Sequence, residues 1–186
     1  MDLELAIRSR RVVRNFTGEP VARDVVARLI DAAVQAPSAM NEQPWTFTVV
    51  RDRGVLARAS TRAKAYALRE PALDLPRSLR DRLAQPDFDL FYHAPALIVI
   101  SSESNHRWAV ENCTLAAENL MLCACAEGLG TCWIGLAQPW LATTDGKQAL
   151  RLSANGVPVA PIIVGEPAAV PPPVPRNPPR IEWLDP

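Results

Sequence analysis

The sequence predicts one domain of the α+β class that spans residues 1–186. Apolar residues recur at helical spacing between positions 21 and 33, segment 45–50 alternates large apolar residues with threonine, and 96–100 is a continuous apolar run. These patterns are typical of an amphipathic helix, a half-buried strand and a fully buried strand. With 48% hydrophobic and 22% charged residues, the composition is that of an ordinary globular protein.

The amino-terminal half is expected to alternate helices with a single strand. The expected helices cover residues 3–10, 20–33 and 54–67, and the strand covers 45–50. Pro37 ends the second helix, because proline cannot continue a helix and disfavours helical backbone in the residue before it. The strand should bury only one of its two faces.

The carboxy-terminal half combines a long helix with further strands. We expect residues 70–90 to form a loop with one short helix, and 107–127 to form the longest helix, ended by Gly128. Residues 165–186 are rich in proline and should follow an extended course. The expected strands cover 96–100, which should be central, 131–134 and 159–164.

The long helix predicts a second subunit. Its apolar residues lie almost all round the helix, which is typical of an element buried on most sides. In a chain of 186 residues, the simplest way to bury such a helix is against its own sheet and a partner chain.

Charge and cysteine usage exclude several classes of function. Twenty basic residues balance twenty acidic ones, so no overall field favours nucleic acid or a membrane surface. The cysteines at 113, 123, 125 and 132, with only His93 and His106, offer no zinc spacing. We expect reduced thiols, a cytoplasmic protein without a membrane span or secretory signal, and no metal site.

An arginine cluster follows the first helix. Arg8, Arg10, Arg11 and Arg14 fall within seven residues of a chain without net charge. Guanidinium groups match phosphate oxygens bidentately, so the cluster is a candidate phosphate site. It equally fits a solvated helix end, where basic residues complement the helix dipole.

Two further segments are candidate parts of a binding site. In 36–45, small Ser38 and Ala39 would let a flat ring approach the backbone, and the Asn41 amide offers donors and an acceptor. The alternative is an ordinary helix-to-strand connection. The glycines of 128–135 follow a helix and precede a strand, which is the reverse of a dinucleotide fingerprint.

In this order along the chain, these blocks resemble the nitroreductase family of flavoproteins. Residues 10–16 look like its phosphate motif, 36–47 is similar to its most recognisable block, and 128–135 to its flavin-edge block. Glu166-Pro167 followed by Arg176 resembles the family's carboxy-terminal end. The resemblance implies a nitroreductase-like fold, in which helices flank a central mixed or antiparallel sheet, and an intertwined homodimer whose tail, 165–186, reaches over the partner.

The resemblance also implies FMN as cofactor and assigns the residues that hold it. Arg10, Arg11 and Arg14 would bind the phosphate and ribityl chain, with Arg176 closing on the phosphate; Val12 stands where the family often has serine. The loop would line the flavin, commonly from the partner subunit, and the strand-end block would offer backbone N–H groups near its N5 edge. The implied flavin-lining residues are Pro37, Ser38, Ala39, Met40, Asn41, Gln43, Trp133, Ile134 and Gly135.

The implied activity is electron transfer from NAD(P)H to a small organic acceptor, such as a nitroaromatic or a quinone, by a ping-pong cycle. The flavin would carry the chemistry, so no catalytic side chain is assigned. Two alternatives stay open: a flavin-dependent dehydrogenase or oxidase of a peptide-like or natural-product substrate, and a non-catalytic flavin-binding dimer.

Overall fold

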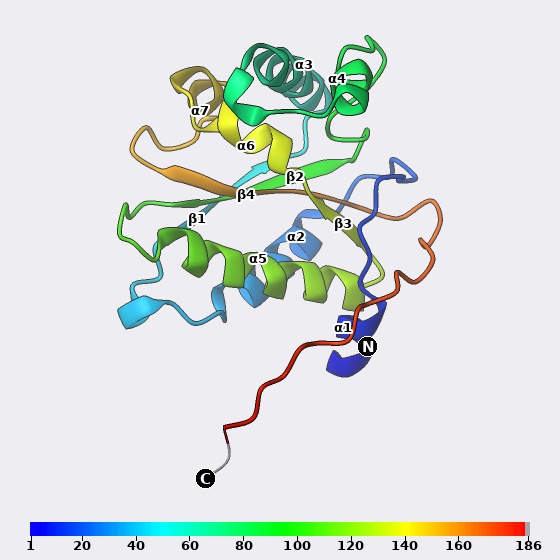
Figure 1. Cartoon of the computed structure of the whole chain (residues 1–186), viewed down its shortest axis with the longest axis vertical. Helices are drawn as coiled ribbons and strands as arrows, with labels where there is room; N and C mark the ends of the chain where they lie inside the picture. Colours follow the sequence, from blue (N-terminus) through cyan, green and yellow to red (C-terminus); the bar gives the residue numbers. More distant parts are fainter. Residues whose placement is uncertain (185–186) are drawn as a thin grey trace.

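A computed structural model describes residues 1–184, which form a sheet with helices on both faces (Figure 1). The strands are β1 (Trp45–Val50), β2 (Ala96–Ser102), β3 (Gly130–Trp133) and β4 (Val157–Gly165). The α-helices are α1 (Leu3–Ser9), α2 (Arg23–Val34), α3 (Arg53–Arg69), α4 (Arg77–Leu83), α5 (Ala109–Ala126), α6 (Gln138–Leu141) and α7 (Thr144–Leu150). Short 3-10 turns lie at Ala39–Asn41 (η1), Pro71–Leu73 (η2) and Gly135–Ala137 (η3).

The sheet has the strand order β1-β2-β4-β3, and all neighbouring strands are antiparallel. The predicted central strand is confirmed, because β2 lies between β1 and β4 and every one of its residues is buried. A parallel bridge between Val12 and Thr131 adds the chain after α1 to the outer edge of β3. This bridge fixes the arginine-rich segment against the sheet.

Alternation along β2 divides the core into two layers. Ile98 and Ile100 pack with α2 and α5, whereas Leu97 and Val99 pack with α3 and α6 on the opposite face. Figure 1 shows the same division: α2 and α5 lie below the sheet, and α3, α4, α6 and α7 lie above it. The sheet is therefore covered on both faces, which explains its unbroken apolar strands.

Helix α5 buries one side and exposes the other. Ala116, Leu120 and Ala124 are fully buried against α2 and the sheet. Val110 and Leu115 keep 50% and 46% of their surface exposed. The helix predicted to be apolar all round thus has an apolar face that this chain leaves uncovered.

The structure corrects several expected elements. Strand β1 is an edge strand that is partly buried on both faces, because Trp45 and Phe47 pack against the core layer of α2 and α5, whereas Val50 packs in the opposite layer. The expected one-sided burial is therefore wrong. Strand β3 ends at Trp133, one residue early. Helices α6 and α7 were not predicted. Gly146 lies within α7, and glycine in the sequence argues against a helix. It is nevertheless required there, because a Cβ would lie 2.2 Å from the Trp140 carbonyl oxygen.

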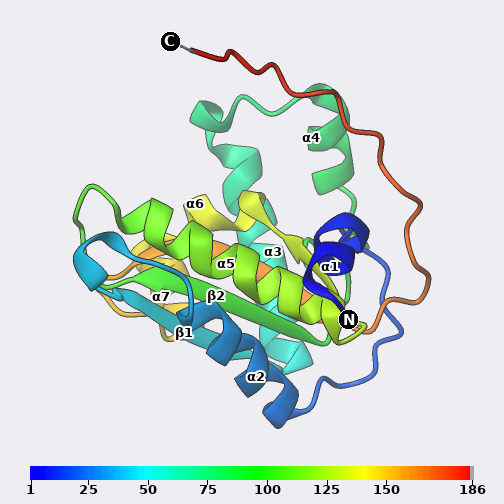
Figure 2. The ribbon, with the colours of Figure 1, turned by 90° about the horizontal axis from the view of Figure 1, so that it is seen from below.

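The carboxy-terminal segment is extended, as its prolines predicted. After the Phe16–Pro167 bridge, residues 172–184 are exposed and run away from the sheet (Figures 1 and 2). No helix in the described part of the chain is long and apolar enough to cross a membrane.

Candidate functional site

The arginine-rich segment is packed tightly against β3. Val13 is buried, and its backbone N–H donates to the Thr131 carbonyl oxygen at 3.0 Å. Gly130 makes this approach possible, because a Cβ there would lie 2.5 Å from Val13 Cγ2. Side chains alternate across an extended segment, so Val12 and Arg14 lie on the face opposite to Val13, and both are exposed.

The three candidate phosphate-binding arginines differ in what they already contact. Arg10 Nε lies 3.5 Å from Glu118 Oε1. Arg11 Nη1 donates to the carbonyl oxygens of Arg8 and Arg10, at 2.6 and 2.9 Å, and so caps the end of α1. Arg14 lies 5.7 Å from the ring centre of Tyr92 and has no carboxylate partner within residues 1–184. Arg14 therefore has the freest guanidinium for an anion.

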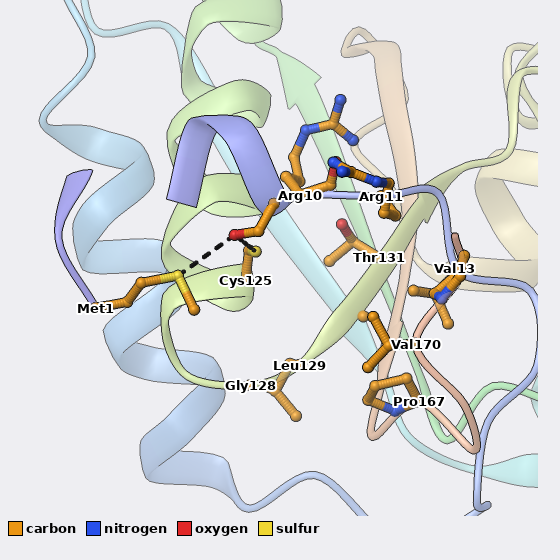
Figure 3. A pocket seen from close by; sticks show the side chains of 13 residues that line it. Met1, Arg10, Arg11, Val13, Cys125, Gly128, Leu129, Thr131, Pro167 and Val170 are labelled. Atoms are coloured by element: carbon orange, nitrogen blue, oxygen red, sulfur yellow. Dashed lines mark hydrogen bonds between the residues drawn. The ribbon is translucent and has the colours of Figure 1, made fainter. Parts of the chain in front are cut away.

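A small cavity lies behind this segment. It has a volume of about 180 Å³ and is enclosed by the chain after α1, the end of α5 and the start of the tail (Figure 3). Val13, Leu129 and Val170 make its wall apolar, and Arg10 and Arg11 lie at its rim. Cofactor pockets usually measure roughly 300–1,000 Å³. One chain thus encloses too little space here for a whole cofactor.

The loop between α2 and β1 has a strained backbone. Met40, Asn41 and Gln43 have positive φ angles of 54°, 55° and 48°, a region that non-glycine residues adopt at a cost. Ser38 Oγ accepts from the Gln43 N–H at 2.9 Å, and the Gln43 side-chain amide donates to Asn41 Oδ1 at 2.9 Å. These bonds hold the loop in shape while Met40 is 95% exposed.

Asn112 of α5 anchors this loop. Its Oδ1 accepts from the Ala39 backbone N–H at 3.0 Å. Asn112 is 2% exposed, and its Nδ2 has no partner among the described residues. A buried donor without an acceptor costs about 1–3 kcal/mol.

The arginine cluster and the loop between α2 and β1, the two candidate parts of the site, lie at opposite ends of α5. Asn112 ties the loop to the start of the helix, whereas Ser9 Oγ lies 3.8 Å from Cys125 Sγ near its end. The rise of an α-helix separates positions 112 and 125 by about 20 Å. Figure 2 shows η1 and α1 at these two ends. A single chain therefore does not bring the arginines and the loop together.

The glycine-rich block forms the turn from α5 into β3 and the exit from β3. Gly128 ends α5 with φ +80°, and the Leu129 N–H returns to the Ala124 carbonyl oxygen at 2.8 Å. The expectation that Ile134 offers a free N–H is wrong, because this group donates to the Pro161 carbonyl oxygen at 2.8 Å. Gly135 is exposed, and its N–H has no backbone acceptor in the described chain.

Trp133 and Arg176 complete the expected set. Trp133 is half-buried and packs at the edge of the core layer that α2 and α5 form. Arg176 is exposed in the tail, and no ion pair joins it to another residue of the described part. The fold of one chain does not bring the loop to the arginine cluster.

Sequence reasoning missed Asn112, Glu118 and Tyr92 as parts of the site. Asn112 had a signal, because it shares a helix face with the apolar positions 109, 113, 116 and 120. A buried amide on such a face needs a specific partner. The contacts of Glu118 and Tyr92 depend on tertiary structure and had no local signal.

Burial sets the thiol chemistry beside the site. The pKa of Cys132 is raised by burial, and the neighbouring Arg14 guanidinium partly opposes this change. Burial alone raises the pKa of the Cys113 thiol to about 11. Both thiols therefore stay protonated at neutral pH and do not act as nucleophiles.

The sequence profile of the nitroreductase family matches residues 7–166. The chain belongs to the nitroreductase family. The family predicted from the motifs is thus confirmed, and the match includes the arginine cluster, the strained loop and the glycine-rich block, but not Arg176.

Relatives and solved structures agree with this family membership. The chain is 31% identical to a 5,6-dimethylbenzimidazole synthase of Rhodospirillum rubrum, covering 89% of this chain and 82% of the relative. It is 30% identical to a 4-nitrobenzoate reductase of Pseudomonas putida, covering 70% and 71% of the two chains. A nitroreductase of Bacteroides fragilis, solved with bound FMN, superposes with a TM-score of 0.87 at 24% identity over the full length of both chains. The predicted nitroreductase-like α+β fold is confirmed.

Proposed function

We propose that this chain is an FMN-dependent oxidoreductase that passes electrons from NAD(P)H to a small organic acceptor. The observation that carries the proposal is the exposed guanidinium of Arg14, which pairs with no carboxylate of residues 1–184 and is held on a segment that Gly130 packs tightly against β3. Family membership supports it, as does the FMN bound in the similar Bacteroides fragilis nitroreductase.

The donors present in this chain suit FMN. Arg10 and Arg14 would hold the phosphate and ribityl chain, and Arg176 would close on the phosphate, since guanidinium groups bind phosphate oxygens bidentately. Arg11 would contribute less, because it already caps α1. The amide of Asn41 would meet the polar edge of the ring, and the free Gly135 N–H would donate to it.

We further propose that two chains build each site. The arginines and the loop lie at opposite ends of α5, so a symmetric pair would bring the arginines of one chain to the loop of its partner. The exposed apolar residues of α1 and α5, including Leu5, Ile7 and Leu115, would be buried between the chains. The extended tail would then lie over the partner.

When bound, FMN supplies the hydride chemistry, and the protein supplies binding and orientation. The arginines would fix the phosphate end, and the loop would hold the ring by its edge, leaving one ring face for the reactants. NAD(P)H and the acceptor would use this face in turn, which is a ping-pong cycle. No side chain has to donate or accept a proton in this scheme.

Loss of cofactor tests the phosphate contacts. Each hydrogen bond to a charged group contributes about 1.5–3 kcal/mol, so replacing Arg10 and Arg14 with alanine should weaken FMN binding roughly 100-fold or more. The flavin absorbance of the purified protein measures this directly. Arg8→Ala is the matched control, because Arg8 is exposed on α1 and, within residues 1–184, forms an ion pair with Glu4 alone. Undiminished colour in the double variant contradicts the proposal.

Mixing two defective variants tests the shared site. Arg14→Ala and Asn41→Ala damage different halves, so each homodimer should be inactive. Subunit exchange would create mixed dimers with one intact site and recover about a quarter of the wild-type activity. If no activity returns although mass spectrometry confirms that subunits have exchanged, the arginines and the loop of each site belong to one chain.

A second candidate is a flavin-dependent oxidase or dehydrogenase of an organic substrate. It is favoured by the 31% identity to a relative named as a 5,6-dimethylbenzimidazole synthase. The two candidates differ in the reductant. Anaerobic bleaching of the flavin by NAD(P)H supports the reductase, whereas oxygen uptake driven by an organic substrate without NAD(P)H supports the oxidase. Flavin binding with neither reaction would indicate a non-catalytic dimer.

A further inference from the structure

Helix α4 places a guanidinium beside the proposed flavin site. Arg82 lies 4.7 Å from the ring centre of Phe88 and 5.8 Å from that of Tyr92. The two rings meet edge to face with centres 5.6 Å apart, and Arg14 lies 5.7 Å from the same Tyr92 ring. We call Arg14, Arg82, Phe88 and Tyr92 the guanidinium–aromatic cluster. Arg14 and Arg82 thus share one phenol ring.

Buried polar contacts fix the chain that carries these rings. Lys64 is 8% exposed, and its Nζ donates to the carbonyl oxygens of Gln85 and Phe88. Ser60 is 3% exposed, and its hydroxyl accepts from the Leu90 N–H at 2.8 Å. A buried ammonium needs such acceptors to offset its desolvation. The position of Phe88 is therefore set from within the core.

The backbone at Tyr92 is strained. Tyr92 and His93 have φ angles of 54° and 55°, which cost about 1–3 kcal/mol each for residues with a side chain. Asp89 holds this turn, since its carboxylate accepts from the Phe91 N–H at 2.8 Å and its carbonyl oxygen from the Tyr92 N–H at 3.0 Å. Strain held in place by such bonds is typical of functional sites.

Arg82 differs from the other arginines of α4 in that none of its side-chain donors has an acceptor within residues 1–184. Arg77 Nε lies 4.0 Å from a carboxylate oxygen of Asp81. Arg80 donates to the carbonyl oxygens of Leu75 and Leu68 at 3.3 and 3.4 Å. The Arg82 guanidinium makes neither an ion pair nor a hydrogen bond with any residue of 1–184. Arg82 is exposed, so its guanidinium remains accessible beside the Phe88 ring.

We propose that Arg82 binds an oxyanion of a reactant at the flavin, and that this oxyanion is the carboxylate of an aromatic acceptor. The inference rests on the proposed function, because Arg14 is what places the cluster beside the flavin. A guanidinium binds a carboxylate bidentately, and the neighbouring rings of Phe88 and Tyr92 can pack against an aromatic acid. The 2′-phosphate of NADPH has the same chemistry and is the other possible source.

Binding of a non-reducible acid tests the site without turnover. Benzoate is titrated calorimetrically into the flavin-loaded protein, with benzamide as the neutral probe of the same shape. Arg82→Gln should weaken benzoate binding about tenfold or more, as expected for a charge-assisted hydrogen bond, and leave benzamide binding unchanged. Arg77→Gln, on the same helix, should change neither. Equal benzoate affinity in wild type and Arg82→Gln, with the flavin retained, overturns the carboxylate assignment.

Steady-state kinetics distinguish the two sources. For the carboxylate, Arg82→Gln should lower kcat/KM for 4-nitrobenzoate relative to nitrobenzene about tenfold, mainly through KM, with NADPH and NADH affected equally. A selective loss of NADPH over NADH instead assigns Arg82 to the 2′-phosphate and refutes the carboxylate. Arg82→Lys keeps the charge without the planar fork, so its kcat/KM for 4-nitrobenzoate should lie between those of wild type and Arg82→Gln. It replaces Arg82→Gln if that variant does not fold.

The outcomes separate this inference from the proposed function. Benzoate binding that depends on Arg82, in a protein whose flavin NAD(P)H does not reduce, would remove the reductase and keep the anion site. Normal reduction by NAD(P)H with Arg82-independent kinetics for both nitro compounds would keep the reductase and remove the anion site.

Discussion

Replacing Gly130 with alanine should detach the arginine-rich segment from the sheet. The new Cβ would lie 2.5, 2.6 and 2.7 Å from Val13 Cγ2, Cβ and Cγ1. Carbon atoms need about 3.5–4.0 Å, so the segment would have to move by about 1 Å. Val13 cannot swing aside, because a β-branched side chain is stiff at χ1 and its Cβ is itself too close.

The expected loss of stability follows from these contacts. Overpacking costs about 1–3 kcal/mol. Lengthening the 3.0 Å bond from the Val13 N–H to the Thr131 carbonyl oxygen adds about 1 kcal/mol. For a chain of this size, the sum corresponds to a Tm lower by roughly 5–15 °C. FMN retention should fall as well, since Arg10 and Arg14 lie on the displaced segment.

Thermal unfolding and flavin content of purified variants measure both effects. Gly135→Ala is the control for stability, because a Cβ there meets no atom within 4 Å. Val13→Gly removes the three clashing atoms, so Gly130→Ala should cost less in that background. A Gly130→Ala protein that melts like wild type and stays yellow refutes the packing argument.

Three further perturbations have defined outcomes. Because burial raises the pKa of Cys113 from 9.0 to about 11, the thiol favours the folded state below pH 9, and this contribution is lost as pH rises toward 11. Urea unfolding at pH 8 and pH 11 should show a smaller loss in Cys113→Ala than in wild type. Thr143→Ala removes the hydroxyl that accepts from the Gly146 N–H at 3.0 Å and caps α7, so urea unfolding should show a loss of about 1 kcal/mol. Leu120→Ala empties a fully buried site and should cost about 2–5 kcal/mol by the same measurement; a loss well below this range would contradict the burial assigned to this face of α5.

Local patterns predicted the elements that bury long apolar stretches. The run of β2 and the length of α5 follow from hydrophobic periodicity, and Gly128 marked the end of α5 because its φ of +80° suits glycine. Helices α6 and α7 were not predicted from the sequence, because they are short and contain Pro139 and Gly146, which usually break helices.

The candidate site was predictable as a set of blocks but not as an arrangement. The order of the motifs identified the arginines and the loop. Their placement at opposite ends of α5 depends on how Asn112 and Cys125 contact distant segments. The pairing of the Ile134 N–H with Pro161 depends on strand register, which a single sequence does not specify. The same holds for the sharing of Tyr92 by Arg14 and Arg82.

The left-handed backbone of the loop before β1 lowers the stability of the protein but gives the loop a fixed shape. Met40 and Gln43 adopt a conformation that glycine would adopt without penalty. Directed evolution for heat resistance alone would therefore be drawn to glycine at these two positions. Such variants would replace a rigid loop with a mobile one, so we expect a more heat-resistant protein to bind flavin less well if this loop lines the site as proposed.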